Sequence, residues 1–341
     1  MRMICKTSIL TAVLAFAGTA ALAKMGKPDR DMDKVLIELQ AKGGKPIESL
    51  TAAEARLQPT PADAVKAVME KSKKTKQPEL AEVREIQVDG ADGKIPARVY
   101  IPKVKGPLPV VVYYHGGGFV IATNDVYDAT PRSLAEQTKA IFVSVEYRKG
   151  PEFKFPKAHD DAYAAYKWAV LNAASFGGDG TKVAVAGESA GANLALNVAI
   201  KARDDGIQKP THELLVYPVA GNNMDTESYK ENAEAKPLNR PMMQWFVKNY
   251  IRTPADANDP RLNLMAANLK DLSPATVITA EIDPLRTEGK DLAKKLKDAG
   301  VKVEYKNYNG VTHEFFGMAN VVDEAKSAQK FASKELKQSF K

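Results

Sequence analysis

The feature that most constrains the fold is a regular alternation of short apolar runs with helical patterns from about residue 110 onward. The apolar runs, each bounded by turn residues, cover residues 110–114, 141–146, 183–186, 214–217, 277–279 and 301–306. The helical patterns cover residues 131–137, 159–172, 190–203, 288–299 and 323–336. Strands that alternate with helices form a mostly parallel sheet, because each helix returns the chain to the same edge. Runs that are apolar throughout fit strands buried on both faces.

Two further patterns precede this alternation. Residues 83–88 and 97–101 are β-branched or alternating runs separated by the turn Asp92-Gly93, which predicts an antiparallel hairpin at one edge of the sheet. The α/β sheet should therefore have eight strands. Residues 31–40 and 51–71 carry helical patterns, the second broken by Pro59 and Pro61. We interpret residues 24–80 as a helical arm and residues 81–341 as the main domain.

The N-terminus has the pattern of a secretory signal. Arg2 and Lys6 precede an apolar run over residues 9–23 that ends in Ala21-Leu22-Ala23. We expect a signal peptide of residues 1–23, cleaved after Ala23, and hence a periplasmic or secreted protein with no membrane attachment after cleavage. A membrane anchor is the alternative, but about 15 residues are short of the roughly 20 that span a bilayer.

Composition excludes several classes of function. The single cysteine, Cys5, lies in the predicted signal, so the mature chain has no thiol for catalysis. The net charge of +7 is modest, and the basic cluster at residues 71–76 lacks aromatic neighbours, which favours a solvated linker and argues against nucleic-acid binding. The four histidines are scattered without metal-ligand spacing, so we expect neither a metal nor an organic cofactor.

A nucleophile motif follows one of the predicted strands. The sequence GESAG at residues 187–191 lies between the strand at 183–186 and the helix at 190–203. Glycines on both sides permit a sharp turn that presents the hydroxyl of Ser189 at a helix N-terminus. A glycine-rich turn that merely caps a helix is the alternative. We favour Ser189 as a nucleophile.

A second glycine motif follows an earlier strand. The sequence HGGG at residues 115–118 comes directly after the buried strand at 110–114. Three glycines allow backbone amides to turn toward a substrate carbonyl, which predicts an oxyanion hole formed by the amides of Gly117, Gly118 and Ala190.

The order of residues along the chain identifies the catalytic base and leaves two candidates for the catalytic acid. Hydrolases with such a serine turn place serine first, an acid next and histidine last. His115 and His159 precede Ser189, and His212 follows it too closely, which leaves His313 as the catalytic base. For the acid, the strand at 277–279 runs into both Glu281 and Asp283; we favour Asp283, although the pattern separates the two only weakly.

One insertion interrupts the alternation. Residues 222–261 lie between two predicted strands and contain a helix with Met242, Trp245, Phe246 and Tyr250 on one face. We interpret the insertion as part of a lid. Its apolar face could line an acyl pocket or pack against the core, so the pattern assigns no substrate-binding residue.

Together these motifs resemble the hormone-sensitive-lipase-like carboxylesterases, bacterial family IV of the α/β-hydrolase superfamily. The resemblance runs from about residue 97 to 316 and rests on YYHGGGF at 113–119, EYR at 146–148, GESAG at 187–191, DPLR at 283–286 and HEF at 313–315. It implies the α/β-hydrolase fold, Asp283 as the triad acid, the three oxyanion amides named above, and a cap built from the arm and the insertion. Glu188 stands where the family usually has aspartate, and Lys149-Gly150 replaces its usual Leu-Ala.

The sequence thus predicts a serine carboxylesterase that acts through an acyl-enzyme on Ser189, and the resemblance implies that its substrates are small esters of short to medium acyl length. An amide or peptide hydrolase with the same triad is one alternative. A binding protein on a catalytically inactive hydrolase scaffold is the other.

Overall fold

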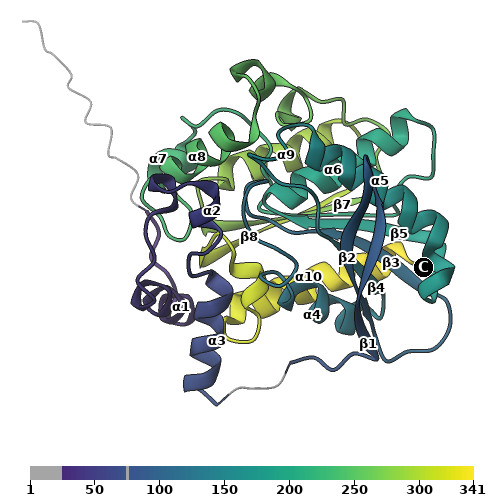
Figure 1. Cartoon of the computed structure of the whole chain (residues 1–341), viewed down its shortest axis with the longest axis horizontal. Coiled ribbons are helices and arrows are strands. Elements are labelled where there is room, and N and C mark those ends of the chain that lie inside the picture. The colour runs from purple at the N-terminus through teal and green to yellow at the C-terminus, as the bar shows by residue number, and fades with distance from the viewer. Residues whose placement is uncertain (1–24, 74–76) are drawn as a thin grey trace, which may run out of the picture.

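An eight-stranded sheet runs through the middle of the molecule (Figure 1). The computed structural model describes residues 25–73 and 77–341; the predicted signal peptide lies outside them and stays a prediction. The strand order is β1-β2-β4-β3-β5-β6-β7-β8. The strands are β1 Glu82–Gly90, β2 Gly93–Ile101, β3 Leu108–Tyr114, β4 Ile141–Val145, β5 Gly178–Glu188, β6 Glu213–Val216, β7 Ala275–Ile282 and β8 Val303–Thr312. The hairpin β1–β2 joins β4 in antiparallel fashion, and all the remaining pairs are parallel.

Helices cover both faces of the sheet (Figure 1). The α-helices of the described residues are α1 Arg30–Ala41, α2 Ala52–Ala55, α3 Pro61–Lys71, α4 Ala129–Thr138, α5 Lys157–Asn172, α6 Ala190–Asp204, α7 Glu227–Glu231, α8 Arg240–Tyr250, α9 Arg286–Asp298 and α10 Asp323–Ser339. One face carries α5, α6 and α9, and the other carries α4 and α10. The structure therefore confirms the predicted α/β architecture, with an apolar core on each side of the sheet.

Several boundaries differ from the sequence prediction, and β5 begins five residues before the predicted 183. β8 continues six residues beyond the predicted 306, to Thr312, because it pairs with β7 as far as Ile282. Its outer positions are polar since it is an edge strand, which hid its length from a search for apolar runs. The helical pattern at 51–71 is broken at the two prolines, as predicted, and forms the separate helices α2 and α3. The hairpin turns at Ala91-Asp92, and Gly93 already belongs to β2.

The arm and the insertion meet above the carboxyl edge of the sheet. Helices α1 and α3 pack on the α10 side through Met32, Val35 and Val65, and the segment between these two helices extends to the insertion. The Trp245 indole of α8 donates a 3.0 Å hydrogen bond to the carbonyl of Leu50. This contact ties the insertion to the arm, so the two segments cover the same edge.

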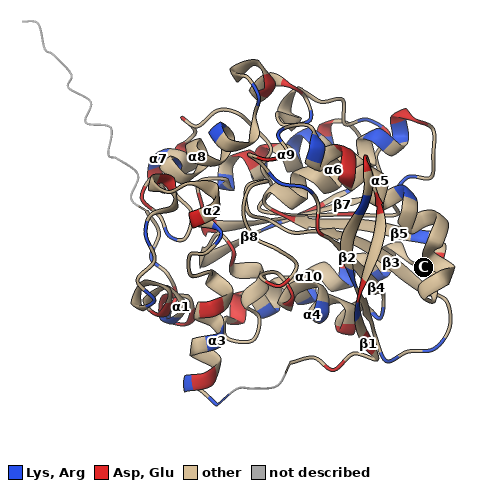
Figure 2. Cartoon of the chain, in the orientation of Figure 1, with Lys and Arg blue, Asp and Glu red and all other residues tan. Residues whose placement is uncertain are grey.

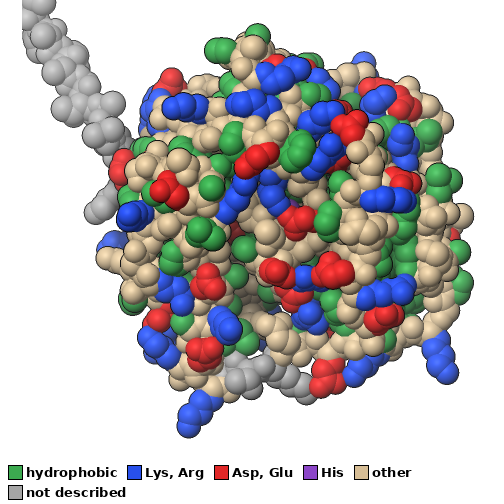
Figure 3. Space-filling model, in the orientation of Figure 1, with side chains coloured by type: hydrophobic (Ala, Val, Ile, Leu, Met, Phe, Trp, Pro, Cys, Tyr) green, Lys and Arg blue, Asp and Glu red, His purple; other side chains and the backbone are tan. Residues whose placement is uncertain are grey.

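Charge is distributed over the whole fold. Figure 2 shows basic and acidic residues on the helices of both faces, and Figure 3 shows the two signs intermixed on the face it presents. Within the described residues, no helix is both long enough and apolar enough to cross a membrane.

Candidate active site

Four strand ends converge at the carboxyl edge of the sheet. β3 ends before the HGGG loop, β5 ends before Ser189, β7 ends before Asp283, and β8 ends before His313. Parallel pairing of β3, β5, β6, β7 and β8 places these ends on one side. Loops at this edge are the usual place for sites in open α/β sheets.

Ser189 lies on a strained turn. Its backbone has φ 56° and ψ −118°, in a region that residues with a side chain seldom adopt. The turn is close-packed: a Cβ on Gly191 would lie 1.9 Å from the carbonyl oxygen of Tyr114. Only glycine fits there, which explains the sequence around the serine. The turn leaves Ser189 at the N-terminus of α6 with 5% of its surface exposed.

Ser189, His313 and Asp283 form a hydrogen-bonded line. His313 Nε2 lies 3.0 Å from Ser189 Oγ, and His313 Nδ1 lies 2.7 Å from Asp283 Oδ2. All three side chains are buried, and Asp283 is fully so. With Nδ1 donating to the carboxylate, Nε2 is free to accept a proton from the serine hydroxyl.

The structure separates the two carboxylates that the sequence left open. Asp283 Oδ1 accepts the amide of Leu285 at 2.8 Å, which leaves Oδ2 directed at His313. Glu281 Oε2 instead accepts the amide of Gly310 at 2.7 Å. A register shift between Ala280 and Ile282 accompanies this divergence. Of these two carboxylates, only Asp283 contacts His313.

The glycine loop lies at the same cavity as Ser189, which Gly117 and Gly118 both line. Gly117 and Gly118 both have positive φ, of 96° and 60°. In the described residues, no backbone or side-chain acceptor receives the amides of these two glycines. The loop is held by the Tyr147 hydroxyl, which donates to the carbonyl of His115 at 2.8 Å. Ala190, the third predicted oxyanion donor, follows Ser189 directly and begins α6.

Glu188, the departure from the family pattern, lies beneath the serine turn. Its carboxylate accepts the Tyr113 hydroxyl at 2.5 Å and also accepts the Tyr217 hydroxyl. Burial, followed by the charge of Glu314, raises the pKa of Glu188 to about 7. Glu188 thus braces the turn from inside the fold and does not reach the reacting atoms.

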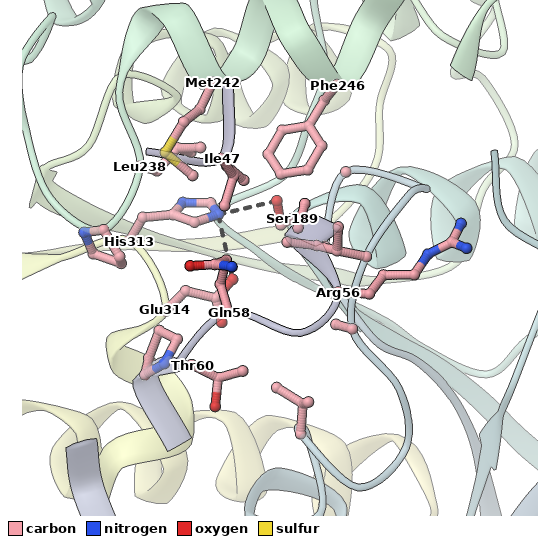
Figure 4. A pocket seen from close by; sticks show the side chains of 18 of the residues that line it. Ile47, Arg56, Gln58, Thr60, Ser189, Leu238, Met242, Phe246, His313 and Glu314 are labelled. Carbon is pink, nitrogen blue, oxygen red and sulfur yellow. Dashed lines mark hydrogen bonds and ion pairs between the residues drawn. The ribbon is translucent and has the colours of Figure 1, made fainter. Parts of the chain in front are cut away.

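A cavity of about 1130 Å³ opens above Ser189 and His313. Figure 4 shows Leu238, Met242 and Phe246 of the insertion on one side, with Gln58, Thr60 and Glu314 on the other. Of the predicted apolar stripe on α8, Met242 and Phe246 line the cavity. Trp245 and Tyr250 are buried elsewhere, against Leu50 and His159. The arm residues Ile47, Arg56 and Gln58 also line the cavity, which no pattern in the sequence indicated.

The remaining histidines have structural partners. His159 bonds to Tyr250 and Asn193, His212 bonds to Thr276, and His115 stacks on Tyr147. Among residues 25–73 and 77–341 no group of three or more potential metal ligands is found.

Comparisons with known proteins agree with this arrangement. A family model described as the alpha/beta hydrolase fold matches residues 111–317. The carboxylesterase NlhH of Mycobacterium tuberculosis (strain ATCC 25618 / H37Rv) is 40% identical over 280 residues, covering 79% of this chain and 88% of that protein. The ethyl acetate hydrolase of Pseudomonas putida is 32% identical over 306 residues, covering 87% of this chain and 94% of that protein. The solved structure of a hyperthermophilic esterase from the archaeon Pyrobaculum calidifontis superposes with a TM-score of 0.83 at 36% identity, covering 92% of this chain and 98% of that chain.

Proposed function

Because the chain belongs to the hormone-sensitive-lipase-like carboxylesterases of the α/β-hydrolase family and is a carboxylic ester hydrolase, we propose that it cleaves small esters through an acyl-enzyme on Ser189. The observation that carries the proposal is the line from Ser189 Oγ to His313 to Asp283, with contacts of 3.0 and 2.7 Å at the base of the cavity.

In acylation, Ser189 Oγ attacks the ester carbonyl carbon while its proton passes to His313 Nε2. The carbonyl oxygen gains negative charge, which the amides of Gly117, Gly118 and Ala190 stabilise. Collapse of the tetrahedral intermediate breaks the bond to the alcohol oxygen, and His313 returns the proton to the departing alcohol. Asp283 orients the imidazole and stabilises its charged form.

Deacylation repeats these steps with water. Water attacks the acyl carbon, gives one proton to His313 Nε2, and the acid leaves as Ser189 regains its hydrogen. No atom outside the chain, the ester and water is required for the balance.

The cavity has room for a small or medium-sized ester. Its volume of about 1130 Å³ is slightly above the range of roughly 300–1,000 Å³ that is usual for small-molecule sites, so the support for the proposed acyl length comes from its walls. Met242, Phe246 and Leu238 provide apolar contacts next to Ser189, which suit an acyl chain of short to medium length.

The test is hydrolysis of p-nitrophenyl esters from acetate to palmitate, with an aminoacyl nitroanilide as the amide comparison. Short or medium esters should be cleaved, and a fluorophosphonate should add covalently to Ser189 in the intact-mass spectrum. Faster turnover of the amide would support the amidase alternative. Absence of both turnover and labelling in the folded protein would support the binding-protein alternative.

Phe246 is expected to limit acyl length. A Cβ on Gly118 would lie 2.2 Å from the Phe246 ring, so the ring closes the cavity directly over the oxyanion loop. In Phe246→Ala, kcat/KM for decanoate relative to acetate should rise on the order of tenfold, because the longer chain gains space. Gln244→Ala, exposed on the same helix, is the matched control and should leave the ratio unchanged. An unchanged ratio in Phe246→Ala would show that the acyl chain lies elsewhere.

Activity should fall in acid with a midpoint above pH 6.5. Burial alone would lower the pKa of His313, but the charge of Asp283 and the hydrogen bond to it outweigh burial, so the pKa is raised from its ordinary value of 6.5. Only neutral His313 can accept the serine proton, and a raised pKa means that protonation sets in at higher pH. The profile of kcat/KM for p-nitrophenyl acetate measures this midpoint. An acid limb centred below pH 6.5 would contradict the raised pKa of His313 and its assignment as the base.

A further inference from the structure

Glu314 is a carboxylate beside the triad for which the mechanism above has no use. It follows His313 directly and has φ 71°, which is a left-handed conformation. This conformation favours glycine, and any residue that has a side chain adopts it only at a cost in free energy. Strain of this kind persists where the surrounding structure holds it, and it is common at functional sites. The conformation brings the side chain of Glu314 back toward the ring of His313.

The carboxylate is fixed between the histidine and the oxyanion loop. Glu314 Oε1 accepts the Tyr127 hydroxyl at 2.6 Å and lies 4.0 Å from His313 Nε2. Tyr127 in turn packs on the loop, since a Cβ on Gly116 would lie 2.2 Å from its hydroxyl. Figure 4 shows contacts from the same imidazole nitrogen to Ser189 on one side and to Glu314 on the other. Glu314 therefore faces the nitrogen that takes up the proton.

Glu314 also has access to solvent. About one fifth of its side chain, 21%, is exposed, and it lines both the active-site cavity and a second cavity of about 380 Å³. The neighbouring carboxylate of Glu188 is instead saturated by Tyr113 and Tyr217 and is only 1% exposed. Of these two carboxylates, Glu314 alone can receive a water molecule at the site of reaction.

We propose that Glu314 positions the water that hydrolyses the acyl-enzyme, an inference that rests on the proposed function. A water molecule about 2.8 Å from both Glu314 Oε1 and His313 Nε2 spans their 4.0 Å separation with an angle of roughly 90° at its oxygen, close to the angle between its two hydrogens. A carboxylate oxygen has two lone pairs, so Oε1 can accept this water and Tyr127 together.

The step balances without further reactants. The water donates a hydrogen bond to Glu314, and this hydrogen stays on the water oxygen. The water gives its other proton to His313 Nε2 while its oxygen bonds to the acyl carbon. The bond to Ser189 Oγ then breaks, and the same proton passes from His313 to Oγ. Glu314 is a positioning residue: it orients the nucleophile and transfers no proton.

An alcohol distinguishes this role from a general electrostatic one. Methanol has a single O–H, so it attacks the acyl-enzyme with His313 as its only required acceptor, whereas water in this geometry uses two acceptors. Loss of the carboxylate should therefore slow hydrolysis much more than methanolysis. A residue that stabilised the imidazolium or the fold would affect acylation, hydrolysis and methanolysis alike.

The experiment measures the partition of the acyl-enzyme. Wild type, Glu314→Gln and the exposed control Glu304→Gln react with p-nitrophenyl acetate at fixed methanol, and the ratio of methyl acetate to acetate is determined together with the nitrophenol burst. In Glu314→Gln the ratio should rise on the order of tenfold or more, since a hydrogen bond to a charged acceptor is lost. The burst should remain, and Glu304→Gln should match wild type.

A second variant guards against misfolding. Glu314→Gly removes the carboxylate and suits φ 71° better than glutamate, so it should fold and raise the ratio at least as much. An unchanged ratio, or an equal fall in both products, in these variants would overturn the proposal while the burst upholds the acyl-enzyme. Absence of both ester turnover and fluorophosphonate labelling in wild type would instead refute the proposed function, and this inference with it.

Discussion

Ser189→Ala should lower kcat for p-nitrophenyl acetate on the order of 10⁴- to 10⁶-fold, because it removes the oxygen that attacks the ester carbonyl. The hydroxyl lies 3.0 Å from His313 Nε2, and the three cavity residues that flank it in Figure 4, Met242, Phe246 and Leu238, are apolar. The residual rate should reflect the oxyanion hole and substrate binding alone. Steady-state rates at saturating ester measure the effect.

The matched control is Ser175→Ala, which removes an exposed serine hydroxyl at the opposite end of β5 from the turn. Both variants should keep the wild-type thermal midpoint to within a few degrees, so that loss of activity can be attributed to the missing oxygen. The strained φ of 56° at Ser189 is equally awkward for serine and alanine, so the variant should not relax the turn. A Ser189→Ala protein that still forms a covalent acyl adduct would place the nucleophile elsewhere.

The strand-turn-helix motifs could be predicted from the sequence because local chemistry dictates them. Gly191 has no room for a side chain next to the carbonyl of Tyr114, and Gly118 has none next to the ring of Phe246. Glycine is therefore required where the backbone makes these close contacts, and the motifs can be read from the sequence. The buried strands could also be predicted from the sequence, because a parallel strand that is covered on both faces is apolar throughout. The mostly parallel sheet and the placement of Ser189 and His313 at its carboxyl edge follow from these two signals.

The cavity walls were much less predictable. A helical stripe shows which face of α8 is buried, but Met242 and Phe246 line the cavity while Trp245 and Tyr250 contact other segments. That division depends on the partner of each side chain, which periodicity does not encode. Arg56, from a short helix far from the motifs, lines the cavity because its guanidinium binds Glu152 and the carbonyl of Val120.

Glu314 belongs to the HEF motif at residues 313–315, but the sequence did not predict the orientation of its side chain. Its left-handed backbone arises where β8 ends, and β8 itself was judged too short because its exposed edge is polar. No helix or strand propensity marks a single residue of this kind, and position beside His313 was the only signal available. The direction of its carboxylate follows from the three-dimensional contact with Tyr127.

The choice between Asp283 and Glu281 also depended on three-dimensional contacts that the sequence does not encode, and it can be tested by mutation. Asp283→Asn should lower kcat on the order of 10⁴-fold. The asparagine amide would face His313 Nδ1, which favours the tautomer with its proton on Nε2, and that nitrogen could no longer accept the proton of Ser189. The change keeps the size of the side chain and an oxygen that can accept the amide of Leu285, so the protein should stay folded.

Glu281→Gln is the matched comparison, two residues away on the same strand end. Its amide oxygen can still accept the hydrogen bond from Gly310, and it does not contact the histidine, so kcat should change little. Steady-state kinetics of the two variants on p-nitrophenyl acetate, with circular dichroism to check folding, decide the matter. If Glu281→Gln lost as much activity as Asp283→Asn, orientation of His313 would depend on both carboxylates, and the 2.7 Å contact with Asp283 would not by itself identify the acid.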